Sequence, residues 1–131
     1  MMRKPAGNRT LAPGDLMEAI HGTDVYKDFE FGSFPCDLQG WGGDSPAFAE
    51  LIKAVRPALV IEVGTWKGAS AVSMADAAGR EGLSTTIVCV DTWLGALEFR
   101  TDQADAERFQ ALECRHGFPQ VYYRFLANVC H

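Results

Sequence analysis

Two acids and two glycines in the middle of the chain have the order of a ligand-binding turn. The apolar run 59–63 contains Glu62, Gly64 follows it directly, and Gly68 comes four residues later, where small residues start a helical pattern. This order predicts a strand, a tight turn with positive φ at Gly64, and a helix whose first N–H groups favour an anionic ligand group. A second apolar run ends at Asp91, whose carboxylate can accept hydrogen bonds from both hydroxyls of a ribose.

The glycine spacing separates the classes of nucleotide-binding loop. A dinucleotide-binding loop requires G-x-G-x-x-G, and a P-loop requires G-x-x-x-x-G-K-[ST], whereas here Lys67 precedes Gly68. Neither pattern fits, so the turn and Asp91 together predict an adenosine-type ligand whose anionic group need not be phosphate. The simplest alternative is a strand–turn–helix unit without a ligand, but such a unit has no need of an acid at the end of both strands.

The arrangement of these residues resembles that of a known family. The pattern Glu62-x-Gly64-x-x-x-Gly68-x-Ser70, followed by a strand that ends in Asp91, resembles the cofactor half of class I S-adenosylmethionine-dependent methyltransferases. The similarity is closest to the catechol and macrocin O-methyltransferase type. It extends over the second half of the chain, from the start of the first strand to the C-terminus.

The resemblance implies a fold, a cofactor and a set of contacts. The fold is an α/β Rossmann-like parallel sheet flanked by helices, and the cofactor is S-adenosyl-L-methionine. In this family the glycine turn holds the methionyl part of the cofactor, and the second acid holds the ribose. Carried over to this sequence, the expected cofactor contacts are Glu62, Gly64, Thr65, Trp66, Lys67, Gly68, Ser70, Asp91, Thr92 and Trp93.

We expect two regions along the chain. Residues 1–56 form an N-terminal arm and cap helices, and residues 57–131 form a partial cofactor-binding domain. Strands are predicted at 59–63 and 85–90, and the first is apolar enough to be covered by helices on both faces. Helices are predicted from Pro46, capped by Ser45, to just before Pro57, over about 68–80, from a cap at Thr101 or Asp102 to just before Gly117, and over about 121–129.

The sequence contains fewer strands than the complete fold of the resembled family. Two convincing strands are present, and the later region in which that family places the residues that act on the acceptor has no counterpart. We therefore expect the N-terminal portion of a methyltransferase fold. Each strand would then expose an unpaired edge, which favours association into a homodimer.

Composition and charge narrow the range of partners. The 131 residues are 47% hydrophobic and 22% charged, which is typical of one globular domain. A net charge of −5 without a basic run argues against nucleic acid or a membrane as partner. The four cysteines are widely spaced, and the neighbouring cysteine and histidine residues lack a second pair at zinc spacing. We therefore expect no metal and a cytoplasmic location.

The expected reaction is transfer of a methyl group to a small-molecule acceptor, but we assign no catalytic residue. His21 and Asp37 are the weak candidates for a general base. The main alternative is a non-catalytic Rossmann-like module that binds a nucleoside or another protein. A dehydrogenase is less favoured, since a pyrophosphate requires a closer backbone approach than the two glycines of the turn provide.

Overall fold

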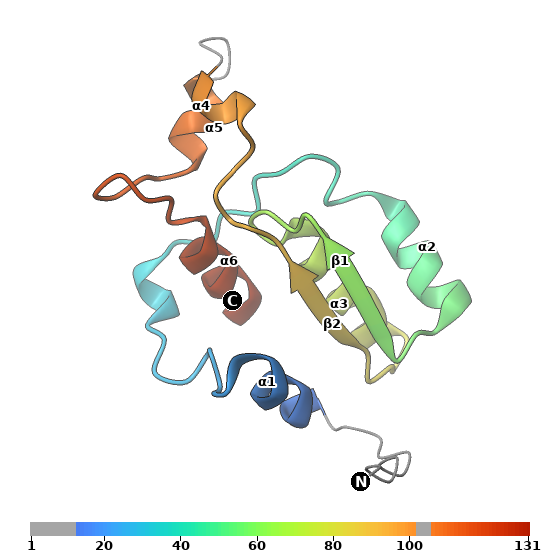
Figure 1. The fold of residues 1–131 in the computed structure, drawn as a ribbon. Helices are drawn as coiled ribbons and strands as arrows, with labels where there is room; N and C mark the ends of the chain where they lie inside the picture. The colour runs from blue at the N-terminus through green and yellow to red at the C-terminus, as the bar shows by residue number, and fades with distance from the viewer. Residues whose placement is uncertain (1–12, 102–105) are drawn as a thin grey trace, which may run out of the picture.

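The computed structural model describes residues 13–101 and 106–131, and it places two strands among short helices (Figure 1). Strands β1 (Leu59–Val63) and β2 (Thr86–Val90) are joined by helix α3 (Ala69–Arg80). The other elements, in chain order, are α1 (Pro13–His21), the 3-10 helix η1 (Phe31–Ser33), α2 (Pro46–Val55), α4 (Glu98–Thr101), α5 (Ala106–Ala111) and α6 (Val121–Cys130). No helix in these described ranges is long and apolar enough to cross a membrane.

The sheet is a parallel pair with a helical crossover. β1 and β2 pair in register from Leu59 opposite Thr86 to Val63 opposite Val90. A parallel pair requires a long connection between its strands, and α3 supplies it. The predicted order of strand, glycine turn, helix and strand is therefore confirmed, with the second strand one residue shorter than the predicted 85–90.

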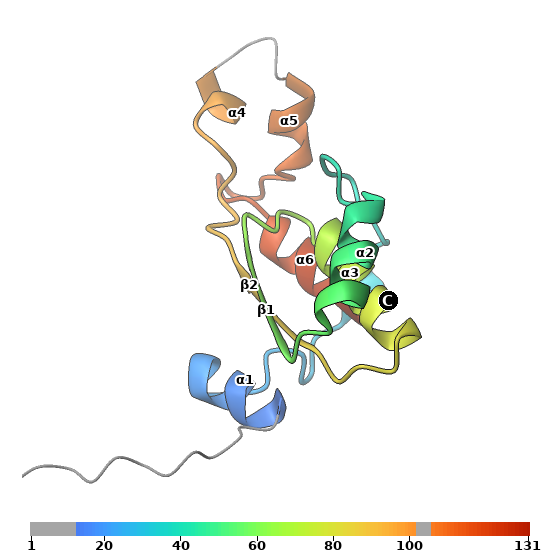
Figure 2. The ribbon, with the colours of Figure 1, turned by 90° about the vertical axis from the view of Figure 1, so that its right-hand side faces the viewer.

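The main apolar core lies between α2, α3 and one face of the sheet. Small residues let α3 approach its neighbours closely, since Ala77 and Ala78 are almost fully buried beside Met74. Ile52 of α2 completes this buried cluster, and Val60 of β1 packs against it. Accordingly, α2 and α3 lie on the same side of the sheet (Figure 2).

The opposite face of β1 is open, and the prediction of a strand covered on both faces was wrong. The side chains of Leu59, Ile61 and Val63 are 49%, 64% and 80% exposed, respectively. Successive side chains of a strand point to opposite faces, so these three turn away from α3. Helix α1 lies on the open side near one end of the sheet (Figure 2), and it leaves these side chains exposed.

The ends of α2 have identifiable caps. Ser45 Oγ accepts a hydrogen bond from the N–H of Ala47 at 3.4 Å, and Pro46 opens the helix, as the sequence predicted. At the other end Arg56 takes a left-handed conformation and donates its N–H to the carbonyl of Ile52. The helix therefore stops just before Pro57, also as predicted.

The helices after β2 differ from the prediction of one helix that ends just before Gly117, because α4 precedes it and α5 already ends at Ala111. Helix α4 forms there because Phe99 is buried against Leu112 and Val121, which gives this stretch an apolar anchor. Thr101 is the last residue of α4 and so is not the cap of the next helix. Asp102, the other predicted cap, lies outside the described residues, as does the arm before α1.

Candidate cofactor-binding site

The turn after β1 has the predicted backbone conformation. Gly64 has a φ of +82° and donates its N–H to the carbonyl of Val90 at 2.9 Å, which ties the turn to the end of β2. A Cβ at Gly64 would meet nothing within 4 Å, so the turn is open at this residue. Gly68 also has a positive φ, of +89°, and it is the N-cap residue of α3.

Close packing against another part of the chain requires a glycine at residue 68, and this residue is not open to a ligand. A Cβ at this residue would lie 2.9 Å from the Phe125 ring of α6, closer than carbon atoms pack. The glycine-rich loop before α2 makes a similar approach, because a Cβ on Gly43 would lie 2.4 Å from the Cβ of Ala69. The first turn of α3 is thus partly covered, and the open side of the site is at Gly64.

The carboxylate of Glu62 accepts hydrogen bonds from side chains of the turn and of the first turn of α3. Thr65 Oγ1 donates a hydrogen bond to one carboxylate oxygen at 2.6 Å, and Ser70 Oγ donates to the other. Cys89 of β2 places its Sγ 3.7 Å from the oxygen that Thr65 contacts. Burial raises the pKa of this thiol, with the neighbouring Glu62 charge adding to the effect, so it stays protonated as a weak donor. Glu62, Thr65 and Ser70 therefore form one cluster at the end of β1.

Asp91 joins the two loops of the site. Its Oδ2 accepts the N–H of Trp66 and its Oδ1 accepts the N–H of Trp93, both at 2.8 Å. Both tryptophans have a φ of +52°, which is uncommon for residues other than glycine. The indole N–H of Trp93 then donates to the carbonyl of Trp66 at 3.1 Å. Thr92, between Asp91 and Trp93, is exposed and accepts the N–H of Leu94 at 3.3 Å.

Lys67 does not face the open side of the turn. Its side chain is buried, and its ammonium group lies 2.6 Å from Asp37 Oδ2 and 3.4 Å from Glu113 Oε1. A buried ammonium paired with two carboxylates is not available to a ligand, so the predicted side-chain contact of Lys67 is not supported by this geometry. Its ion pairs instead connect the turn to Asp37 and Glu113.

Two polar residues of α6 complete this ion-pair network. Arg124 contacts both carboxylate oxygens of Glu113, at 3.1 and 2.5 Å. The amide group of Asn128 donates to the carbonyls of Asp37 and Lys67, both at 2.7 Å, and accepts the N–H of Asp37 at 2.9 Å. The network thus joins the N-terminal segment, the turn and α6.

The network sets the charge state of its acids. Burial alone would raise the pKa of Asp37, but hydrogen bonds from Lys67 and the N–H of Gln39, together with the Lys67 charge, hold it below its ordinary value of 3.8. Burial alone would likewise raise the pKa of Glu113, but Arg124 and Lys67 hold it below its ordinary value of 4.5. Asp37 is therefore an ion-pair partner with little basicity, which removes it as the general base considered from the sequence.

Sequence reasoning missed most of this network. Asp37 was considered only as a base, and the helix predicted over about 121–129 was given no contact with the turn. Arg124 and Asn128 are four residues apart, so they share one face of that helix. Two polar residues at this spacing within an apolar helix were the signal that could have indicated a buried polar contact.

Aromatic residues cover the turn on its outer side. The Trp41 ring lies 5.9 Å from the Trp66 ring and 5.8 Å from the Phe99 ring, measured between centroids. The Arg108 guanidinium lies 5.3 Å from the centre of the Trp41 ring. Trp41 is nevertheless 57% exposed, so it is a surface residue stacked on the turn. The indole N–H of Trp66 also donates to the side-chain oxygen of Gln39 at 3.2 Å.

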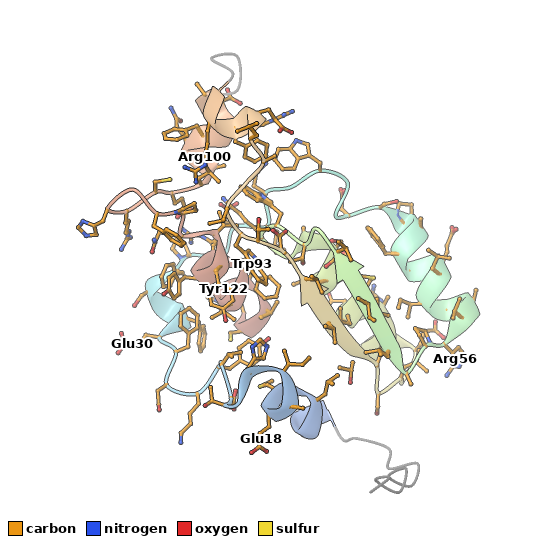
Figure 3. The ribbon with its side chains drawn as sticks, in the orientation of Figure 1. Glu18, Glu30, Arg56, Trp93, Arg100 and Tyr122 are labelled. Carbon is orange, nitrogen blue, oxygen red and sulfur yellow. The ribbon has the colours of Figure 1, made fainter. Side chains whose placement is uncertain are left out.

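A cavity of about 460 Å³ runs along β2. Every residue from Thr85 to Asp91 lines it, together with Trp93 and residues of α1 and α6. Two of the lining residues, Trp93 and Tyr122, lie next to each other (Figure 3), with ring centroids 5.0 Å apart. Most of the lining is apolar, and His21, the other base considered from the sequence, is one of its polar groups. Within the described residues no group of three or more His, Cys, Asp or Glu could hold a metal ion.

Comparison with known proteins identifies the family. Residues 61–129 match a family model described as a methyltransferase domain, a segment that contains the turn, Asp91 and all but the last residue of α6. No curated protein and no solved structure gives a significant match. The matched segment is more than half of the chain and includes both acids and both glycines from which the sequence argument started. The chain belongs to the methyltransferase domain family.

Proposed function

We propose that the chain binds S-adenosyl-L-methionine and serves as the cofactor-binding portion of a class I methyltransferase that acts on a small-molecule acceptor. The observation that carries the proposal is the position of Asp91 at the carboxyl end of β2, beside the open turn at Gly64. Ligands of parallel α/β sheets bind at this end of the strands. Membership of the methyltransferase family supports the same reading.

The residues present fit the nucleoside end of the cofactor. A carboxylate has about four acceptor positions. Asp91 uses one on each oxygen for the backbone N–H groups of Trp66 and Trp93, which leaves acceptor capacity for two ribose hydroxyls. The cavity along β2 reaches Asp91, and its volume of about 460 Å³ falls in the range of small-molecule sites.

Of the contacts predicted from sequence, we propose direct cofactor binding for Gly64, Trp66, Asp91 and Trp93. Glu62, Thr65 and Ser70 are engaged with one another, and Lys67 with Asp37, so these side chains shape the turn. The bound cofactor supplies an electrophilic methyl group on a sulfonium. The contribution of this chain is to bind and orient it, and the aromatic cover of Trp41 and Phe99 limits the access of water to the turn.

Calorimetric titration with S-adenosyl-L-methionine and S-adenosylhomocysteine tests the proposal. We expect both to bind, and we expect Asp91→Asn to weaken both by about ten- to a hundredfold, since it removes charge-assisted acceptors. Asn keeps a carbonyl oxygen for one backbone N–H, and Asp76→Asn, at an exposed position of α3, is the matched control. The proposed site would be contradicted if the folded wild type did not bind either ligand, or if Asp91→Asn and Asp76→Asn bound with equal affinity.

The second candidate is a non-catalytic module that binds a nucleoside or a protein. The observation in its favour is that Glu62, Lys67 and Asp91 all have partners within the chain, so the turn is internally satisfied without a ligand. A radiolabelled-methyl transfer assay separates the two functions. Transfer to any acceptor excludes the non-catalytic module, whereas failure to bind the cofactor excludes the first proposal. We place either protein in the cytoplasm, since the free cysteines suit a reducing compartment.

A further inference from the structure

The turn after β1 has a backbone conformation that its first central residue does not favour. The N–H of Gly68 donates to the carbonyl of Thr65 at 2.9 Å, which closes a β-turn. Its central residues are Trp66 and Lys67, and Trp66 has a φ of +52°. Glycine, asparagine and aspartate dominate this position in turns with a positive φ. A tryptophan here therefore requires contacts from outside the turn to hold its backbone.

Each peptide group between residues 65 and 68 is bound by a side chain from another part of the chain. Asp91 accepts the N–H of Trp66 at 2.8 Å. The indole N–H of Trp93 donates to the carbonyl of Trp66 at 3.1 Å. The amide group of Asn128, in α6, donates to the carbonyl of Lys67 at 2.7 Å. The loop after β2 thus supplies two of the contacts, and α6 supplies the third.

Asn128 fixes Lys67 at both of its ends. Its amide nitrogen holds the Lys67 carbonyl directly, and it also donates to the carbonyl of Asp37 at 2.7 Å. Its amide oxygen accepts the N–H of Asp37 at 2.9 Å, so both backbone groups of Asp37 are bound to one side chain. The carboxylate of Asp37 then lies 2.6 Å from the Lys67 ammonium group. One asparagine therefore sets the position of the lysine backbone and of the partner of its side chain.

The packing of α6 does not account for an asparagine at this position. Phe125, Leu126 and Ala127 are buried apolar residues that already fix the helix in the core. Asn128 is only 4% exposed, and a buried amide is unfavourable unless it is hydrogen-bonded. Its three hydrogen bonds go to main-chain groups that lie 61 and 91 residues away in the sequence. The amide thus connects distant segments at the turn.

We infer that Asn128 is a positioning residue of the cofactor site. It holds the turn 65–68 in the conformation that receives S-adenosyl-L-methionine, and it acts through the Lys67 carbonyl and through Asp37. The inference rests on the function proposed above, because it takes this turn as part of the cofactor site. A site that already has its binding conformation loses less free energy to ordering when the ligand binds. Without the Asn128 contacts the turn populates other conformations, and the apparent affinity falls with the competent fraction.

Amide hydrogen exchange of the ligand-free protein is the first test. The N–H groups of Trp66 and Gly68 are both hydrogen-bonded, so their exchange reports opening of the turn. We expect Asn128→Ala to speed their exchange by about tenfold or more relative to amides in the middle of α3. Ile52→Ala, in the core between α2 and α3, is the control for a general loss of stability and should not single out the turn. Equal acceleration of the turn and of α3 in Asn128→Ala would overturn the inference.

Calorimetric titration of the folded variants with S-adenosyl-L-methionine is the second test. Asn128→Ala should weaken binding by about tenfold, whereas Ile52→Ala should change it by less than about twofold. Equal affinity of the wild type and Asn128→Ala would overturn the inference and leave the proposed function standing. A folded wild type that does not bind would overturn the proposed function, and the positioning role with it. If Asn128→Ala does not fold, Asn128→Ser keeps one hydroxyl donor and should weaken binding in the same direction.

Discussion

Asp91 and Trp66 are joined by a 2.8 Å hydrogen bond from the backbone N–H of the tryptophan to the carboxylate. The bond connects the end of β2 to the turn that follows β1, so the loops of the two strands are held as one unit. Trp66 has a positive φ, and its hydrogen bond to Asp91 helps to offset the cost of this less favourable backbone conformation. Asp91 therefore has a structural role in addition to the proposed contact with a ribose.

Asp91→Ala should lower the free energy of unfolding by about 2 kcal/mol, because two partly buried backbone N–H groups lose their acceptor. Asp91→Asn, which retains one carbonyl oxygen, should lose about half as much. Urea denaturation measures both, and Asp76→Ala on the exposed side of α3 should change stability by less than about 0.5 kcal/mol. A fully stable Asp91→Ala protein would show that the loops are held by other contacts.

The sequence predicted the parts of the fold that depend on local patterns. The apolar run 59–63, the positive φ of Gly64 and the Ser45 cap all follow from residues close together in the chain, and the structure confirms each. The positions of both acids at strand ends are likewise as predicted. These features are local because turns, caps and strand periodicity are decided within a few residues.

The features that were missed depend on contacts between distant segments. Lys67 was expected among the cofactor contacts that the resemblance implies, but its side chain turns toward Asp37 and Glu113, which come from other parts of the chain. Gly68 was expected among the cofactor contacts, and a Cβ at this residue would meet the ring of Phe125. The open face of β1 was missed because a continuous apolar run does not tell which face has a covering helix.

Stability should fall as the pH is lowered below about 4.5. The folded-state pKa values of Asp37 and Glu113 lie below their ordinary values of 3.8 and 4.5, so the unfolded chain takes up protons first. Their contribution is complete above the ordinary values and is lost as the pH falls through the folded values. Lys67→Met should flatten this dependence, because Lys67 is a main cause of the lowered pKa of Asp37.

At neutral pH the same variant should cost about 2 kcal/mol of stability. This is less than the cost of breaking a fully buried pair, since Asp37 is 36% exposed and stays hydrated. Arg56→Met, which breaks the exposed pair with Glu81, is the control and should cost less than about 1 kcal/mol with no change in the pH dependence. Denaturation curves from pH 7 to pH 3 give both quantities. An unchanged pH dependence for Lys67→Met would show that its ion pair does not form in solution.

Gly68→Ala should destabilise the protein through two separable effects. The left-handed backbone, with a φ of +89°, costs any side chain about 1 kcal/mol. The added Cβ also lies 2.9 Å from the Phe125 ring, and overpacking of this kind costs about 1–3 kcal/mol more. Gly82→Ala has a φ of +64° and meets nothing within 4 Å, so it measures the backbone effect alone.

The difference between the two variants therefore reports the contact with α6. Phe125→Leu combined with Gly68→Ala should recover part of this difference, because a smaller side chain leaves room for the Cβ, and the two changes should be non-additive. Urea denaturation of the two single variants, the double variant and Gly82→Ala completes the comparison. Equal losses for Gly68→Ala and Gly82→Ala would mean that α6 does not pack against the turn, and the ion-pair network that joins α6 to Lys67 would then lose its geometric basis.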